Sequence, residues 1–316
     1  MPIAIHEQHP GLRPYLGRGV GRGGPSQQTM LEAITAIAED GLVILENAVE
    51  LAHVDALNEQ MVKDTMDLVN RATTHFNSAG NISQVPPIRP ETMFEDIFAN
   101  QFAGPILEGM LGPKPVLWYL NGNTALKSES RQDVHADLAW RHMHHTFGLV
   151  VNIMLVEATK ENGTTEVWLG THRNTTIADH VSEDSGAIKP DLLEARRAVR
   201  PPIQARIPKG SLIIRDLRLW HAGMPNHTDI PRCMVAMVHS PAWLGNKIRL
   251  KLPENVRPMI ESFKSPIRYS AEYVDPEGFD HLSLAFNYDP SPGGGLPKDE
   301  RAEWARQWKQ KWGSRF

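Results

Sequence analysis

Two histidines and one aspartate in this sequence have the types and the spacing of a metal site. His135 and Asp137 stand two residues apart in VHADLAW, and His221 follows in LWHAGMPN. Residues i and i+2 of a strand project from one face, so the imidazole and the carboxylate can reach the same ion. Two histidines and one carboxylate on one face of a metal leave three adjacent positions open, as in the facial triad of non-haem iron(II) oxygenases. We therefore predict that these three residues bind iron(II), where O2 reacts.

An arginine after the third ligand indicates a carboxylate-bearing cosubstrate. Arg232 follows His221 by eleven residues and opens an apolar run in PRCMVAMV. An arginine inside a barrel is costly to desolvate unless an anion meets it, and its planar fork suits a carboxylate. A dicarboxylate that chelates iron through its keto-acid end would present its far carboxylate to Arg232. A structural ion pair with an internal acid is the alternative.

Other side chains near these positions have more than one interpretation. The histidines of RHMHH are interpreted as loop or surface residues, with pocket lining as the alternative: His142, His144 and His145. Asp216 is expected to form a turn or to orient an imidazole through a hydrogen bond. Tryptophans flanking the triad in sequence either wall a pocket or fill the core: Trp140, Trp168 and Trp220. The asparagines at 121 and 123 are candidate polar contacts.

The composition describes an ordinary globular chain and excludes several classes of protein. The 316 residues are 41% hydrophobic and 22% charged, with a formal charge of −4 and a pI near 6.4. This balance offers no basic surface to nucleic acid or to an anionic membrane, so we expect neither partner. Cys233 is the single cysteine, which excludes an intrachain disulfide and cysteine-based zinc sites. We find no signal peptide or long apolar run, so a cytoplasmic location is expected.

The N-terminal part is expected to be helical after a flexible arm. Residues 1–28 are rich in glycine, proline and arginine, and cannot bury enough apolar surface to order themselves. Apolar residues at helical spacing predict a helix from Thr29 that Gly41 ends, followed by a buried strand over 42–45. The next predicted segments are a helix over 51–71, a polar loop over 72–90, and helical structure over 91–111 broken at Gly104-Pro105.

From Pro115 onward, short apolar runs alternate with turns. The predicted strands are Val116–Leu120, Gly148–Val156, Thr165–Leu169, Ile203–Ile207, Ser211–Arg215 and Met234–His239. This pattern favours a mainly β sandwich or barrel over a parallel sheet with crossover helices. A final helix is expected from about Lys298, with one aromatic stripe that docks on the barrel or on a second subunit of a homodimer: Trp304, Trp308 and Trp312. We expect a single domain over 29–316.

The chain resembles the phytanoyl-CoA dioxygenase family of iron(II)- and 2-oxoglutarate-dependent oxygenases. The matching pieces stand in the family's order: QDVHADLAW, FGLVVNIMLVEATKENGTTEVWLGTHRNT, PKGSLIIRDLRLWHAGMPN and PRCMVAMVHS. An earlier segment, EDGLVILENAVE, is similar to the family's opening strand. The arrangement further resembles the fungal branch that modifies secondary metabolites. The resemblance implies a double-stranded β-helix, also called a jelly-roll or cupin-like core, with flanking helices.

The resemblance also assigns roles to individual residues. It implies iron on the predicted triad, the far carboxylate of 2-oxoglutarate on Arg232, and a hydroxyl contact to that carboxylate from Thr165. Gln132 matches an amide that lies beside the cosubstrate in relatives. The family's usual Pro-Gly-Ser-His turn is Leu169-Gly170-Thr171-His172 here, and Gly223 replaces a serine found in some members.

These assignments predict a dioxygenase that oxidises a small molecule while 2-oxoglutarate becomes succinate and CO2. Asp137 argues against halogenation, because halogenating relatives have a small residue there; hydroxylation, desaturation, epoxidation and cyclisation stay open. We expect a small, largely apolar metabolite as substrate. A CoA thioester would need basic residues such as those of 195–215, which are more simply interpreted as a solvated face. A cupin-type metal isomerase, a cosubstrate-independent dioxygenase and a non-enzymatic jelly-roll binding protein are the alternatives.

Overall fold

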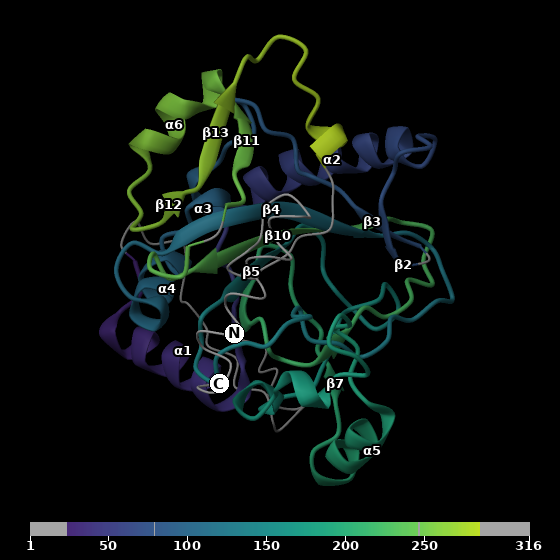
Figure 1. Cartoon of the computed structure of the whole chain (residues 1–316). Helices are drawn as coiled ribbons and strands as arrows, with labels where there is room; N and C mark the ends of the chain where they lie inside the picture. Colours follow the sequence, from purple (N-terminus) through teal and green to yellow (C-terminus); the bar gives the residue numbers. More distant parts are fainter. Residues whose placement is uncertain (1–23, 79, 246, 285–316) are drawn as a thin grey trace, which may run out of the picture.

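The computed structural model describes residues 24–78, 80–245 and 247–284 (Figure 1). The predicted C-terminal helix with its tryptophan stripe lies outside these residues, as does the predicted arm apart from 24–28. The described α-helices are α1 (Gln27–Asp40), α2 (Leu51–Leu68), α3 (Glu95–Phe98), α4 (Ala103–Leu111), α5 (Pro190–Val199) and α6 (Arg257–Ser262). Within the described ranges, we find no helix whose length and apolar character would let it span a membrane.

Helix α1 has both of its ends defined by local hydrogen bonds. The Ser26 side chain accepts a hydrogen bond from the backbone N–H of Thr29, so the helix begins earlier than predicted. Gly41 adopts the left-handed conformation with φ 87°, and its N–H donates to the Ile37 carbonyl. The predicted stop at Gly41 is therefore confirmed. The buried strand that follows, β1 (Leu42–Leu45), is confirmed as well.

Two predictions for the next segments are wrong in part. The predicted loop over 72–90 contains two short strands, β2 (Phe76–Ser78) and β3 (Asn81–Ser83), which extend the sheet edge through backbone pairing and lack a clear apolar alternation. The helical break precedes Gly104-Pro105, between α3 and α4, where the Asn100 side chain accepts from the N–H groups of Phe102 and Ala103. Pro105 then fits within the first turn of α4, where N–H groups have no helical partner.

The strands form one large and one small antiparallel sheet that face each other. The large sheet has the order β1-β8-β5-β10-β4-β3-β2, with β12 added to β4 in parallel. The other strands of this sheet are β4 (Val116–Ala125), β5 (Leu149–Met154), β8 (Leu212–Asp216), β10 (Arg232–Ser240) and β12 (Arg268–Tyr269). The small sheet has the order β7-β6-β9 and consists of β6 (Glu166–Val167), β7 (Ile203–Gln204) and β9 (His221–Ala222). The predicted mainly β jelly roll with flanking helices is confirmed.

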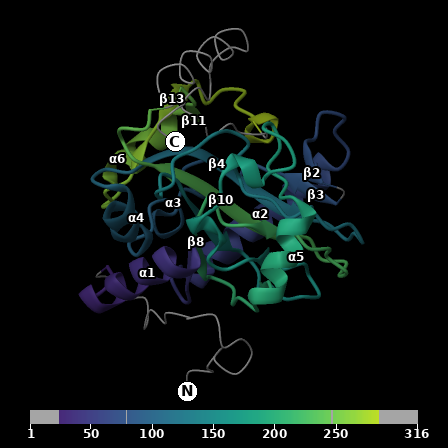
Figure 2. The same cartoon turned by 60° about the horizontal axis from the view of Figure 1, so that its bottom comes forward.

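The six predicted strands are all present, but their lengths differ. β4 continues five residues beyond the predicted end, whereas β6 and β7 are two residues each. A separate parallel pair, β11 (Leu250–Pro253) and β13 (Ala271–Val274), packs near α6 (Figure 1). In both overall views α1 and α4 lie together, and α5 lies away from α6 (Figure 2).

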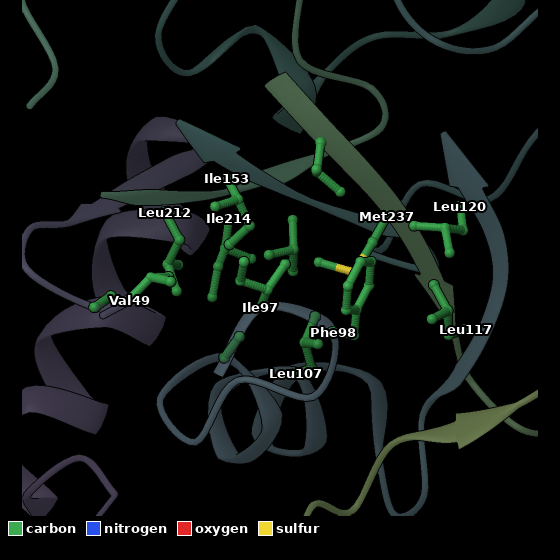
Figure 3. Packing of buried hydrophobic residues seen from close by; sticks show 14 of the residues in the cluster. Val49, Ile97, Phe98, Leu107, Leu117, Leu120, Ile153, Leu212, Ile214 and Met237 are labelled. Atoms are coloured by element: carbon green, nitrogen blue, oxygen red, sulfur yellow. The ribbon is translucent and has the colours of Figure 1, made fainter. Parts of the chain in front are cut away.

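One face of the large sheet packs into the apolar core, and the other face lines a cavity. On β10, Cys233, Val235 and Met237 belong to the main apolar core. Figure 3 shows this core, where Ile97 and Phe98 of α3 pack against side chains of the sheet. The alternate residues of β10 line a cavity on the opposite face: Arg232, Met234, Ala236 and Val238. This alternation follows from the two-residue period of a strand and places Arg232 on the inner face.

Candidate active site

The backbone brings His135 and His221 together. Each donates its N–H to the carbonyl of the other at 2.9 Å, as one isolated antiparallel bridge. The prediction that the His-x-Asp pair lies on a regular strand is wrong, because the surrounding segment forms isolated bridges only, from His135 to His221 and to Ala187. The Asp137 N–H donates to the Leu217 carbonyl at 3.0 Å. These three bonds tie the irregular segment to the chain that carries His221.

The three side chains converge as a metal site requires. Their ligand atoms all lie within 4.8 Å of one another. Oδ1 of Asp137 is 3.5 Å from Nε2 of His221 and 3.8 Å from Nε2 of His135. Nδ1 of His135 lies 2.8 Å from the Asp133 carbonyl, and Nδ1 of His221 lies 3.0 Å from the Leu219 carbonyl. Because a carbonyl oxygen can only accept a hydrogen bond, each Nδ1 carries the donated hydrogen, and each Nε2 is left to bind a metal.

The electrostatics of the site favour the protonation states of metal ligands. Burial alone would raise the pKa of Asp137, but the positive charge of Arg215 outweighs it, together with His221 and His135, so the net pKa is lowered. Burial and the same arginine lower the pKa of His221 to about 3. An ionised carboxylate beside a neutral imidazole is the form that binds a divalent cation. A donor set of two imidazole nitrogens and one carboxylate fits iron(II).

A cavity of about 660 Å³ opens between the two sheets and reaches all three residues. The apolar side chains of its lining come from the large sheet and include Leu42, Ile44, Val150, Met154, Ile213 and Val238. The polar side chains of the lining include Asn77, Asn81, Asn123, Arg131 and Asp133. The volume is in the range of small-molecule sites.

Arg232 lies in the same cavity without an acidic partner. Its side chain is buried, and its Nε donates to the Asn162 carbonyl at 3.1 Å. Within the described part of the chain no carboxylate forms an ion pair with Arg232. The described residues therefore do not support the alternative that Arg232 forms a structural ion pair. Burial lowers the pKa of Arg232 to about 10, which still leaves it cationic at neutral pH. A buried cation is costly unless an anion compensates its charge, and at this cavity the anion would be part of a bound ligand.

Gln132 and Thr165 also line the cavity. Oε1 of Gln132 accepts the N–H of Gly223 at 2.8 Å, and the Gln132 N–H donates to the Gly223 carbonyl at 2.9 Å. A Cβ added at Gly223 would lie 2.5 Å from Oε1 of Gln132. Glycine at 223, in place of the serine of some relatives, thus makes room for the glutamine. Thr164, by contrast, uses its hydroxyl to hold the Ala205 carbonyl at 2.9 Å.

Two cavity residues were missed by the interpretation of the sequence. Arg215 was counted within a solvated basic run, but it lies on the inner face of β8 with its Nη2 2.5 Å from Oδ2 of Asp137. The alternation of Leu212 and Ile214 with Ile213 and Arg215 was the signal that could have placed it inside. Asn152 lies on the buried floor of the cavity, and its side chain makes no hydrogen bond among the described residues.

The other basic residues of the 195–215 run contact the protein itself. Arg200 pairs with Asp40 at 2.8 Å, and Arg206 pairs with Glu157 at 2.8 Å. The remaining contacts are Lys209 with Asp55, Arg196 with the Leu169 carbonyl, and Arg197 over the ring of Trp168. These five residues of the run therefore contact the protein itself and do not line the cavity.

Several secondary candidates lie outside the cavity lining. Of the two roles expected for Asp216, turn formation is confirmed, because its carbonyl accepts from the Leu219 N–H at 3.1 Å and its Oδ1 accepts from the Arg218 N–H at 2.9 Å. Its side chain also forms a buried ion pair with Arg218 at 2.7 Å and accepts from Thr146, so it does not orient a ligand imidazole. His142 is buried in its loop and is not a surface residue, whereas His144 and His145 are exposed. The three tryptophans pack in apolar clusters: Trp140, Trp168 and Trp220. Of the two asparagines, the one at 123 lines the cavity.

Comparisons with known proteins agree with this geometry. The fold is similar to EctD from S. alaskensis, solved with 2-oxoglutarate and 5-hydroxyectoine, at 17% identity over 81% of this chain and 90% of that chain (TM-score 0.56). It is also similar to the epimerase SnoN, solved with Fe3+, alpha-ketoglutarate and nogalamycin RO, at 15% identity over 69% of this chain and 85% of that chain (TM-score 0.52).

The sequence comparison covers the segment that carries the whole triad. Residues 37–234 match the family described as Phytanoyl-CoA dioxygenase (PhyH), and this range includes Arg232 as well as the three predicted ligands. The match, together with the His-Asp-His cluster, confirms the predicted class of iron- and 2-oxoglutarate-dependent dioxygenases. The chain belongs to the phytanoyl-CoA dioxygenase family.

Proposed function

We propose that this protein oxidises a small, largely apolar metabolite of secondary metabolism, with iron(II) on His135, Asp137 and His221 and the far carboxylate of 2-oxoglutarate on Arg232. The observation that carries the proposal is the buried Arg232, which has no acidic partner among the residues that the structure describes and opens into the cavity that contains the triad. SnoN, a structural neighbour, was solved with a nogalamycin compound, which is in keeping with a metabolite as substrate.

Iron(II) bound with 2-oxoglutarate and O2 supplies the oxidising chemistry, and the cosubstrate leaves as succinate and CO2. The chain's own groups do the positioning. The carbonyls of Asp133 and Leu219 hold the two imidazoles with Nε2 toward the cavity. We assign Thr165 and Gln132 to the cosubstrate end as well, since both line the cavity that Arg232 enters.

The apolar side chains of the lining favour some substrates over others. Leu42, Val150 and Val238 line the cavity with Asp137 and Arg215, where they would limit the access of water to a bound substrate. Burying apolar area contributes about 25 cal/mol per Å², so a hydrocarbon skeleton is favoured there over a strongly hydrated one. Hydroxylation, desaturation, epoxidation and cyclisation all begin with a hydrogen or a double bond held close to the metal, and the cavity shape selects among them.

Replacing Arg232 tests the assignment of the cosubstrate. In Arg232→Gln we expect the Kd for 2-oxoglutarate, measured anaerobically with Fe(II) by the visible absorption of the chelate, to rise by about tenfold or more, because one charge-assisted contact is lost. Fe(II) binding without cosubstrate should stay as in the wild type. Met237→Leu, on the opposite face of β10 in the apolar core, serves as the control and should leave both constants unchanged.

An unchanged 2-oxoglutarate Kd in Arg232→Gln would contradict the role of this arginine. Turnover assays distinguish the proposed function from two alternatives, a cosubstrate-independent dioxygenase and a cupin-type isomerase. We expect a metabolite of a test panel to be oxidised only when 2-oxoglutarate is present, with one succinate formed for each 2-oxoglutarate consumed. Conversion of substrate without 2-oxoglutarate would favour the alternative, and failure of the protein to bind Fe(II) would favour a binding protein.

A further inference from the structure

The two oxygens of Asp137 point to different partners. Oδ1 faces the imidazoles, 3.5 Å from Nε2 of His221 and 3.8 Å from Nε2 of His135. Oδ2 is 2.5 Å from Nη2 of Arg215, which donates a hydrogen bond to it. Hydrogen bonds between ionised groups are shorter and stronger than neutral ones. One carboxylate oxygen is therefore directed at the metal position and the other is held away from it.

Arg215 is well placed to act as a fixed support. It lies within β8, paired with Leu42 of β1 on one side and Val150 of β5 on the other. Its side chain is 12% exposed and that of Asp137 is 14% exposed. Within the described residues Asp137 is its single acidic partner, and its buried Nη1 has no hydrogen-bond partner. Separating two such buried charges leaves both uncompensated, so the pair is strongly held.

We propose that Arg215 is a positioning residue that restricts Asp137 to one oxygen toward the metal. The inference rests on the proposed function, because it requires the metal to bind at Asp137. A carboxylate free to turn can offer both oxygens to an ion. The second oxygen would then take a coordination position that the keto-acid end of 2-oxoglutarate needs.

Removing the guanidinium donor of Arg215 should therefore affect the affinity for the metal and the affinity for 2-oxoglutarate in different directions. Loss of the positive charge near the cation site, together with a freely turning carboxylate, strengthens metal binding or leaves it unchanged. The same change weakens 2-oxoglutarate binding, because the cosubstrate has to displace an oxygen of Asp137. A residue that merely supports the fold would weaken both together.

The experiment compares three variants with the wild type. Arg215→Met fills similar space without a donor, Arg215→Gln keeps a neutral N–H donor, and Arg200→Leu breaks the Arg200–Asp40 pair outside the cavity as a control. Folding is monitored by circular dichroism and urea unfolding. The Kd for Co(II) and its absorption spectrum report the metal alone, and the Kd for 2-oxoglutarate is measured anaerobically with Fe(II).

In Arg215→Met we expect a changed Co(II) spectrum, a Co(II) Kd no higher than in the wild type, and a 2-oxoglutarate Kd raised by about tenfold, the scale of one charge-assisted hydrogen bond. Arg215→Gln should stay within about threefold of the wild type for 2-oxoglutarate, since a neutral donor is weaker but present. Arg200→Leu should match the wild type in all three measurements.

The inference is overturned if Arg215→Met keeps the wild-type spectrum and 2-oxoglutarate affinity, or if both of its affinities fall together. If Arg215→Met does not fold, Arg215→Leu, which also lacks a donor, takes its place under the same criteria, and a loss of cosubstrate affinity in Arg215→Gln as large as that of Arg232→Gln contradicts the inference. Failure of the proposed function would look different, because the wild type itself would then bind neither the metal nor 2-oxoglutarate.

Discussion

At the scale of single residues, the candidate metal site depends on which nitrogen of each imidazole is free. The Asp133 carbonyl accepts from Nδ1 of His135, and the Leu219 carbonyl accepts from Nδ1 of His221. Both acceptors are backbone atoms two residues before the histidine, so the orientation of each ring is set by its local chain. A bound cation would meet two imidazoles already turned toward it.

Replacement of His135 tests the metal assignment. In His135→Ala we expect metal binding to weaken by more than about a hundredfold, since losing even an outer partner of a metal ligand costs about 10–100-fold. The measurement is a Co(II) or Fe(II) titration under anaerobic conditions. His144→Ala removes an exposed imidazole from the neighbouring loop and should bind metal as the wild type does. Wild-type metal affinity in His135→Ala would refute the assignment.

At the scale of elements, the pairing of β4 with β10 fixes the floor of the cavity. Asn123 faces Met234 across this pair, and Gly122 faces Val235. A Cβ on Gly122 would lie 2.8 Å from the carbonyl oxygens of both Gln84 and Met234. Because these are backbone atoms on neighbouring chain segments, they cannot move aside without shifting the sheet. Glycine at 122 allows this close approach.

Two glycine substitutions should therefore differ in their effect on stability. Gly122→Ala is expected to lower the free energy of unfolding by about 1–3 kcal/mol, as overpacking does in well-packed interiors. Gly109→Ala, within α4, meets the flexible end of the Ile34 side chain at 3.0 Å and gains helix propensity, so its stability should stay within about 1 kcal/mol of the wild type. Urea unfolding at neutral pH compares the two, and equal effects would contradict this packing argument.

At the scale of the whole molecule, the jelly roll buries ionisable groups that its chemistry does not use. His239 lies on β10 and His142 lies in the loop after the metal residues, and both are buried. Burial lowers the pKa of His239 to about 3 and that of His142 to about 4, from an ordinary value of 6.5. Between these values the unfolded chain binds protons that the folded protein does not. The free energy of unfolding should therefore fall as the pH is lowered from about 6.5 toward 4.

Replacing one buried histidine should reduce this pH dependence. Each such group contributes at most about 1.4 kcal/mol per pH unit within its window. We expect His239→Leu to show a smaller loss of unfolding free energy between pH 7 and pH 5 than the wild type, measured by urea unfolding in metal-free buffer. His144→Ala, which changes an exposed side chain, is the control. A pH dependence identical to the wild type in His239→Leu would show that this histidine does not contribute.

Local chemistry decided much of what could be predicted. Gly41 ends α1 because glycine adopts the left-handed conformation without strain, and the apolar face of α2 follows from spacing alone. The types and order of His135, Asp137 and His221 predicted an iron site. Arg232 in an apolar run predicted a buried cation that meets either a cosubstrate carboxylate or an internal acid. These features depend on a few neighbouring residues, so they can be recognised without knowing the fold.

The tertiary structure alone decided how those residues meet. His135 lies in an irregular segment and is placed by backbone bonds to His221, a pairing between positions far apart in the chain. Arg215 has the same side chain as its solvated neighbours, and only its register on β8 puts it against Asp137. The sequence by itself determined which groups could bind a metal and a dicarboxylate. Which oxygen of Asp137 faces the metal, and what the cavity walls accept, depends on contacts between distant strands that no local pattern encodes.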